Sequence, residues 1–326
     1  MKRIVLLASF AALAACGGSQ PPTAAPGAMS QSRAIAAHSQ RGGSWMLPEA
    51  KKKDLIYVSS FGPPSGPWQI LVFSYPQGEL LGTLSGFPEL LGECVDKKEN
   101  VFVTSATSSG VGYIYEYAHG GSSPIATLND PLTSPESCSV DAKTGNLAVI
   151  SVGGVAVYPH AQDSPTTYTD PSFGAMNYGG YDNQGNLFVD GTRESVGFVF
   201  AELPSGSSGF RDIYVDQPCR DDGSVQWDGR YITLQTVAQG GFAPRVIYRL
   251  SVSGSSATVL GTTALKSNRN RYDGGQFWIQ GKDVIGPDND GESVALWKYP
   301  IGGRGIRTIR NVGREAWGVA VSLAAR

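Results

Sequence analysis

The sequence has few of the residues on which metal sites and polyanion-binding surfaces depend. Of its 326 residues only 3 are His, which argues against a His-rich metal site, and only 17% are charged. The 26 Lys and Arg residues are offset by 28 Asp and Glu residues, so the formal net charge is −2. We expect no nucleic-acid partner, because such a balance provides no basic surface. No G-x-S-x-G motif occurs, so no serine has a recognisable nucleophile context.

Glycine, by contrast, is abundant. The chain holds 42 Gly and 20 Pro residues, and 41% of its residues are hydrophobic. The glycines do not recur at every third position, which excludes a collagen-like triple helix. The apolar content is too high for a disordered chain. The composition indicates a turn-rich globular protein with a sizeable core.

The N-terminus has the features of an export signal. Lys2 and Arg3 precede an apolar run over residues 4–13, which is about half the ~20 residues that a membrane-spanning helix needs. The segment LAAC at residues 13–16 resembles the lipobox of bacterial lipoproteins. The resemblance implies that Cys16 becomes a lipid-modified N-terminus. The protein would then be attached to the bacterial cell envelope, at the outer membrane where the organism has one. An ordinary cleaved signal with a chance cysteine is the alternative.

The segment that follows the signal has the composition of a linker. Residues 16–44 are rich in Gly, Ser, Pro and Ala, which cannot bury enough apolar surface to offset the entropy of ordering them. We therefore expect a signal peptide over residues 1–15, a flexible tether over 16–44 and a folded domain over 45–326.

One strand pattern recurs through the folded domain. Clear copies are LIYVSS, NVFVTS, NLAVIS and NLFVDG, which begin at residues 55, 100, 146 and 186, and looser copies begin at 230 and 283. Several follow an Asp with Gly or Asn, which between two apolar runs predicts a tight hairpin. A second pattern of strand, Gly/Ser/Pro turn and strand alternates with the first. Each repeat of roughly 45 residues thus supplies four strands, the size of one propeller blade.

Six copies of both patterns predict an all-β fold, a six-bladed β-propeller with four antiparallel strands per blade. AWGVAVS at residues 316–322 has the pattern of an innermost strand whose partner is LIYVSS. Pairing of these N- and C-terminal strands would close the ring and remove an exposed edge. A β-sandwich or a solenoid is the alternative, and the regular spacing with complementary ends argues against both.

The repeats GECVDKKENVFV and GGYDNQGNLFVD resemble those of NHL-type and gluconolactonase-like six-bladed propellers, over nearly all of residues 50–326. Within that group the chain is most similar to secreted bacterial lipoproteins. The residues that carry the resemblance are structural. The fold hosts hydrolases, carbohydrate binders and protein-interaction modules, so it does not by itself specify a function.

Polar residues on the loops that lead into the innermost strands are expected to converge on one mouth of the central channel. Together with residues where second strands end and one loop tryptophan, the candidates for a ligand face are Glu93, Glu136, Asn177, Asp190, Arg271, Asp273, Glu315 and Trp68. Glu93 and Glu136 stand where the repeat normally has an apolar or small residue. With Glu315 they could hold a hard cation through oxygen ligands.

Gluconolactonase-like propellers hold a divalent ion in the channel through carboxylate and amide oxygens. The resemblance implies that Glu93, Asn177 and Asp190 would bind Ca²⁺ or another divalent cation here. A water-filled polar channel with Arg–Glu pairs is the alternative. No catalytic residue is assigned.

Three cysteines remain after lipidation of Cys16, an odd number for an oxidising compartment. Cys94 and Cys138 stand near equivalent positions of neighbouring blades, although their offsets from the turn Asp differ by one residue. They could form a disulfide that leaves Cys219 free, or all three could be buried thiols. Trp68, in the loop FGPPSGPW, would suit sugar stacking if exposed; a core or loop-anchoring role is the alternative.

The leading hypothesis is a monomeric, lipid-anchored envelope propeller that binds an unidentified protein or glycan partner through its loop-bearing face. One alternative is a metal-dependent hydrolase of the lactonase type. The other is a cell-surface carbohydrate binder that uses Trp68.

Overall fold

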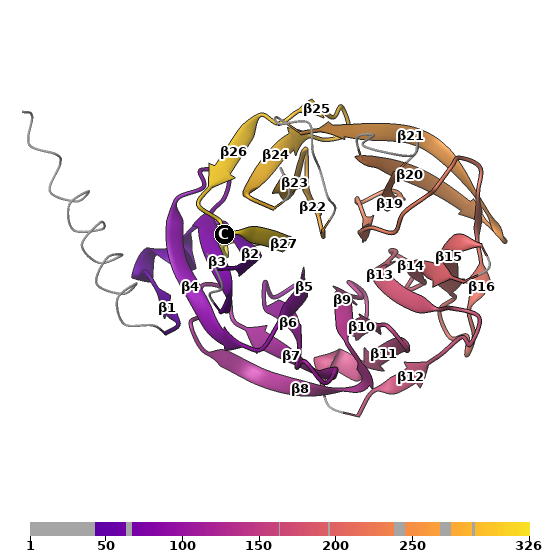
Figure 1. The fold of residues 1–326 in the computed structure, drawn as a ribbon, viewed down its shortest axis with the longest axis horizontal. Coiled ribbons are helices and arrows are strands. Elements are labelled where there is room, and N and C mark those ends of the chain that lie inside the picture. The colour runs from indigo at the N-terminus through magenta and orange to yellow at the C-terminus, as the bar shows by residue number, and fades with distance from the viewer. Residues whose placement is uncertain are drawn as a thin grey trace, which may run out of the picture. The chain divides into compact units, whose positions relative to one another are not determined.

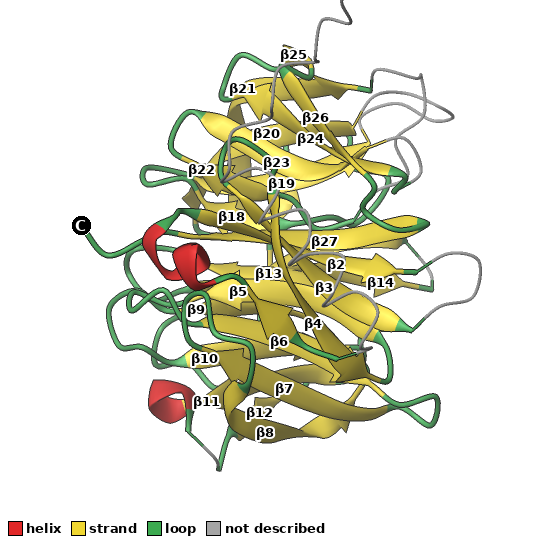
Figure 2. Cartoon of the chain, turned by 90° about the vertical axis from the view of Figure 1, so that its left-hand side faces the viewer, coloured by secondary structure: helices red, strands yellow, loops and turns green. Residues whose placement is uncertain are grey.

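The structure, a computed structural model, describes residues 43–62, 67–162, 164–194, 196–237, 245–267, 275–288 and 291–326. Six sheets are arranged in a ring around a central channel, which confirms the predicted six-bladed β-propeller (Figure 1). The strands cross the thickness of the ring, and the loops gather on its two faces (Figure 2). Helix in the described ranges is confined to two 3₁₀ turns, η1 (Pro48–Lys52) and η2 (Pro159–Ala161). Within the same ranges, no helix has the length and apolarity needed to cross a membrane.

Each blade has four core strands, which follow one another from the channel outward. Blade 1 consists of β27 (Glu315–Ser322), β2 (Leu55–Phe61), β3 (Trp68–Ser74) and β4 (Leu80–Phe87). Blade 2 consists of β5 (Leu90–Val95), β6 (Val101–Ala106), β7 (Val111–Tyr117) and β8 (Pro124–Thr133). Blade 3 consists of β9 (Pro135–Val140), β10 (Leu147–Ser151), β11 (Gly154–Tyr158) and β12 (Thr166–Tyr168).

The second half of the ring repeats this order. Blade 4 consists of β13 (Ala175–Tyr181), β14 (Leu187–Arg193), β15 (Gly197–Leu203) and β16 (Arg211–Asp212). Blade 5 consists of β18 (Val225–Trp227), β19 (Ile232–Val237), β20 (Arg245–Ser253) and β21 (Ser256–Lys266). Blade 6 consists of β22 (Trp278–Gln280), β23 (Asp283–Asp288), β24 (Ser293–Lys298) and β26 (Arg307–Arg310). Short strands extend two outer edges: β1 (Trp45–Met46) pairs with β4, while β17 (Tyr214–Val215) and β25 (Gly303–Arg304) pair with β21.

The Asp of the repeat forms the hairpin between the first two strands of a blade. In blade 2 the Oδ1 atom of Asp96 accepts hydrogen bonds of 2.8 Å from the N–H groups of Lys98 and Asn100. Asp182 makes the same pair of bonds in blade 4. These are Asx turns, in which the short carboxylate satisfies backbone donors that the hairpin leaves unpaired. These turns explain why an Asp followed by Gly or Asn recurs between the first two strands of several blades.

The ring closes through its terminal strands, as the sequence predicts. β27 pairs antiparallel with β2, and Leu55 lies opposite Ser322. The end of β27 is also fastened to blade 2, because the Ser322 hydroxyl donates to the Glu99 carbonyl oxygen at 2.8 Å. The Leu323 N–H donates to the Glu99 carboxylate at 2.6 Å. The closing strand is thereby held by two blades.

Hydrophobic clusters fill the spaces between neighbouring blades, and one of them contains a disulfide. Cys94 of β5 and Cys138 of β9 are bonded, with their Cα atoms 5.6 Å apart, and both are buried. Cys94 and Cys138 differ by one residue in their distance from the turn Asp, and this difference lets their side chains meet. Neighbouring blades present opposite faces to each other, and successive side chains of a strand point to opposite faces. Cys219 is free and half-buried.

Candidate functional site

Four innermost strands have a β-bulge where the loops of one face enter the ring. In β9 and β27 one residue, Glu136 and Trp317 respectively, has no partner on the neighbouring strand. In β5 and β13 two residues lie opposite a single residue of the neighbouring strand. A bulge turns side chains out of the regular pleat and often does so beside a functional site. We term the channel opening bordered by these bulges the mouth.

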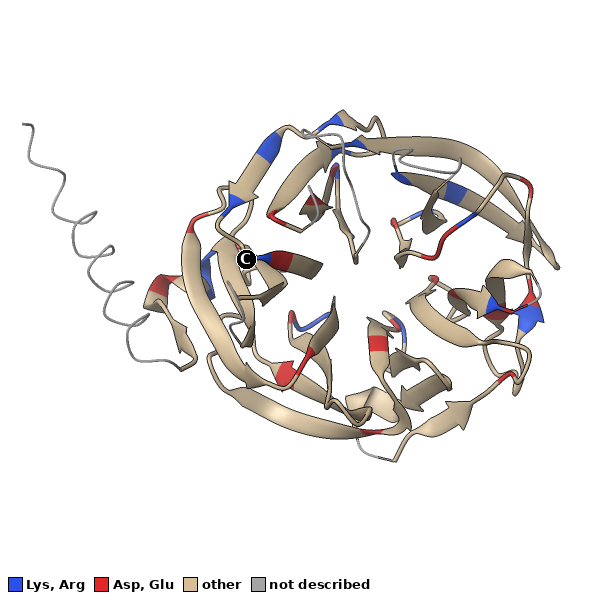
Figure 3. Ribbon diagram, in the orientation of Figure 1, with Lys and Arg blue, Asp and Glu red and all other residues tan. Residues whose placement is uncertain are grey.

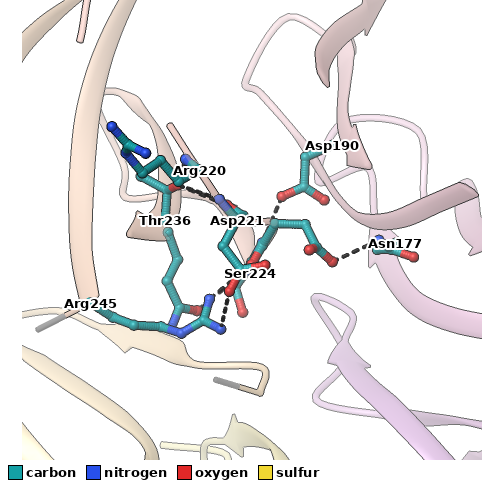
Figure 4. Close-up of polar contacts among 10 residues, drawn as sticks. Asn177, Asp190, Arg220, Asp221, Ser224, Thr236 and Arg245 are labelled. Carbon is teal, nitrogen blue, oxygen red and sulfur yellow. Dashed lines mark hydrogen bonds and ion pairs between the residues drawn. The ribbon is translucent and has the colours of Figure 1, made fainter. Parts of the chain in front are cut away.

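A buried carboxylate fixes the bulge of β13. Asp190, labelled in Figure 4, is completely buried. Its carboxylate accepts hydrogen bonds from the N–H groups of Tyr178 at 2.9 Å and Gly223 at 2.8 Å. Burial, followed by repulsion from Asp222, raises the pKa of Asp190 well above its ordinary value. Asn177 projects from the same bulge and donates to Asp222 at 2.6 Å. The structure thus brings Asn177 and Asp190 together, and both oxygens of Asp190 accept backbone N–H groups.

One buried arginine forms hydrogen bonds with the loop that leads into blade 5. Arg245 is 8% exposed, and its guanidinium donates to the Asp222 carbonyl at 2.9 Å and to the Asp221 carboxylate at 2.8 Å. The Thr236 hydroxyl donates to the Asp221 carbonyl at 2.7 Å. These bonds hold the loop against blade 5, so Arg245 positions the loop and its charge is already paired.

Glu136 is the extra residue of the β9 bulge at the mouth, and it is half-buried. Burial, with repulsion from Glu89 and Asp222, raises the pKa of Glu136 to about 7. Both charged neighbours that act on Glu136 are acidic. Figure 3 shows acidic residues on the innermost strands β9 and β27. The mouth therefore concentrates negative charge around Glu136 as the pH rises through neutrality.

Glu93 is a buried carboxylate. Its side chain is fully buried between β5 and β27, and a Cβ atom on Gly318 would lie 2.5 Å from its Oε2 atom. Burial raises the pKa of Glu93 to about 8, and the hydroxyl and backbone of Ser59 offset only part of that. Neither carboxylate oxygen has a hydrogen bond of good geometry within the described residues.

Two of the remaining candidates, Glu315 and Trp68, lie within the described residues. Glu315 is half-buried at the start of β27. The sequence places Trp68 in a loop, but in the structure it is the first residue of β3 and pairs with Phe87. The centroid of its ring lies 5.1 Å from that of Phe61. Arg271, Asp273 and Cys16 lie outside the described residues.

The carboxylate and amide set that the resemblance would assign to a divalent ion does not converge. Glu93 is buried against Gly318 of β27, and both oxygens of Asp190 accept hydrogen bonds from backbone N–H groups. Among the described residues no three His, Cys, Asp or Glu side chains lie close enough to share a metal ion. We therefore derive no chemical step through a cation.

Two glutamines tie the innermost strands to one another, a feature that sequence reasoning missed. The Gln276 side chain bonds both backbone groups of Glu93, accepting from its N–H at 2.8 Å and donating to its carbonyl. Gln226 does the same with Ile279, at 2.7 Å and 3.3 Å. Each side-chain amide takes the place of a neighbouring strand along an unpaired inner edge. The only signal in the sequence is an amide beside apolar residues, within β18 for Gln226 and just before β22 for Gln276.

Replacing Gln276 by Leu is expected to destabilise the fold by about 2–4 kcal/mol, because the Glu93 N–H and carbonyl are left buried without partners. Chemical denaturation measures the loss, and Gln184→Leu, on an exposed turn, is the control. Equal stability of the two variants would show that the Gln276 bonds contribute nothing.

Comparison with known proteins identifies the fold and not a family. No protein-family model matches the chain, and no curated protein sequence matches it. A chain in the crystal structure of the nidogen/laminin complex is similar, with a TM-score of 0.64 and 13% identity over 84% of this chain and 100% of that chain. TolB from Acinetobacter baumannii is similar with a TM-score of 0.60 and 13% identity, over 90% of this chain and 71% of that chain. At such identity the likeness supports the six-bladed propeller fold alone.

Proposed function

We propose that this propeller is a lipid-anchored binding module of the bacterial cell envelope, within the NHL-like and gluconolactonase-like group, and that its mouth takes a cationic group of the ligand. The lipobox-like segment ending at Cys16 motivates the anchor. The disulfide between Cys94 and Cys138 supports export, because structural disulfides persist in oxidising compartments.

One observation carries the choice of ligand. Glu136 is held on a bulge beside Glu89 and Asp222, and the buried cation Arg245 is already bonded to the Asp221–Asp222 loop. A primary amine or a guanidinium would relieve the repulsion among these carboxylates and form charge-assisted hydrogen bonds. The bound group would be an exposed Lys or Arg of a partner protein, or a small polyamine.

Spermidine and tri-arginine are suitable probes for calorimetric titration of the full chain. Binding is expected to strengthen as the pH rises through about 7, since each Glu136 carboxylate that loses its proton adds a charge to the mouth. Glu136→Gln is expected to weaken binding about tenfold and to remove most of the pH dependence.

Glu79→Gln is the matched control, because Glu79 is an exposed acid that pairs with Lys53 outside the mouth. Equal binding by the Glu136 and Glu79 variants would place the cationic group elsewhere. Stoichiometric metal in the purified protein, with lactone hydrolysis that chelation abolishes, would replace the proposal with the metal-dependent hydrolase.

A further inference from the structure

A cavity occupies the half of the channel that lies away from the mouth. It has a volume of about 260 Å³ and is bounded by the ends of innermost strands from five blades. The exposed turn residues Ala142 and Asn183 border it, so it opens to solvent on the face of the Asx turns. None of the mouth carboxylates Glu89, Glu136 and Asp222 borders it.

Gln276 lines the cavity close to the bulges that border the mouth. Its side chain lines the cavity and is bonded to the inner edge of β5 through Glu93. At the same level β5 and β9 come close, since a Cβ atom on Gly92 would lie 2.7 Å from the Glu136 carbonyl oxygen and 2.8 Å from Gln276. The cavity wall therefore contains a different part of the inner strands from the one that carries Glu89, Glu136 and Asp222.

The cavity offers no unpaired charge to a ligand. Asp182 is the only Asp, Glu, Lys, Arg or His among the described residues of its wall, and its carboxylate accepts from the N–H groups of Gln184 and Asn186 and from the Asn186 amide. Polar wall residues are also committed to neighbouring inner strands: the Ser139 hydroxyl accepts from the Tyr181 N–H at 3.1 Å. Because a buried charge needs a partner, the cavity selects an uncharged molecule.

The wall also contains apolar and aromatic side chains. Trp227, Trp278 and Val140 line the cavity together with the Cys94–Cys138 disulfide. The Trp227 indole N–H has no hydrogen-bond partner among the described residues. An apolar cavity of about 150 Å³ holds benzene, so this larger cavity has room for one substituted or fused ring. Pockets of this kind bind through apolar surface and a few directing polar groups.

We propose that the cavity is a second binding site, for an uncharged ring compound with an apolar face. This site goes beyond the proposed function, which concerns the mouth. The ring would lie between the tryptophan-bearing ends of β18 and β22, with a hydroxyl or carbonyl substituent accepting from Trp227. An aromatic ring and the apolar face of a sugar share this chemistry, and two probes distinguish them: indole and methyl β-glucoside.

Calorimetric titration of the full chain tests the proposal. One of the two probes is expected to bind with 1:1 stoichiometry, and Ala142→Trp, which fills the open end, is expected to weaken that binding at least tenfold. Ala142 is exposed on a turn, so its replacement leaves the core intact. Gln184→Trp adds the same ring to an exposed turn residue that does not border the cavity and is expected to bind as the parent does.

Trp227→Phe provides a second variant, since it keeps the apolar ring and removes the N–H. It is expected to weaken binding of a probe with an acceptor substituent several-fold. Failure of both probes to bind the folded parent protein, or binding that Ala142→Trp leaves unchanged, would overturn the proposal. Glu136→Gln is expected to leave this binding unaltered, so loss of the mouth's cation binding and loss of ring binding are separate results.

Discussion

Removing the disulfide in the Cys94→Ala/Cys138→Ala double variant is expected to lower the thermal midpoint by roughly 10 °C. The bond joins neighbouring innermost strands across a sequence separation of 44 residues, so it limits the freedom of the unfolded chain. A loop of this length corresponds to about 4 kcal/mol in the chain-entropy description, and measured losses are typically 2–4 kcal/mol. For a domain of this size about 1 kcal/mol shifts the midpoint by roughly 2–4 °C.

Calorimetry with and without reductant measures this effect. Reductant is expected to lower the midpoint of the parent protein towards that of the double variant and to leave the double variant unchanged. Cys219→Ala is the control, because Cys219 is free and burial raises its pKa to about 12, which keeps it an unreactive thiol. A double variant as stable as the Cys219 control would mean that the cross-link does not constrain the unfolded chain.

The same pair of cysteines illustrates which features of the fold can be predicted from the sequence and which cannot. The repeat fixes the number of blades, the hairpin Asp and the closing strand, because each is a local pattern repeated at a regular spacing. In the sequence, the one-residue offset between Cys94 and Cys138 argues against a disulfide if residues at the same position of the repeat are assumed to face each other. In the ring, however, neighbouring blades pack opposite sheet faces against each other, and successive side chains alternate between those faces. The two cysteines must therefore differ by one position for their side chains to meet.

The site is less predictable because it depends on departures from the repeat. A bulge in β9 turns Glu136 towards the mouth, whereas Glu93 in β5 lies three residues before the turn Asp and points into the gap between blades. Neither bulge has a local signature in the sequence. The bonds from Gln276 to Glu93 join residues 183 apart, so only the closed ring reveals them.

Glu93→Gln is expected to abolish a loss of stability that the parent protein undergoes on going from acidic to alkaline pH. The pKa of Glu93 is raised from 4.5 to about 8 by burial. Between these two values the folded protein keeps a proton that the unfolded chain has lost, so stability falls as the pH rises through this window and levels off above it. Below the lower value both states are protonated and the penalty vanishes.

Chemical denaturation at pH 5, 7 and 9 measures the effect. At pH 9 the Gln variant is expected to be more stable than the parent protein by on the order of 3–5 kcal/mol, and at pH 5 the two are expected to be similar. Glu79→Gln, at an exposed position, is expected to follow the pH profile of the parent. If Glu93 were instead a cation ligand, added Ca²⁺ would stabilise the parent protein at alkaline pH and would leave the stability of the Gln variant unchanged. Parallel profiles for the parent and Glu93→Gln would show that the carboxyl is hydrated, and its assignment to the buried gap between β5 and β27 would then be wrong.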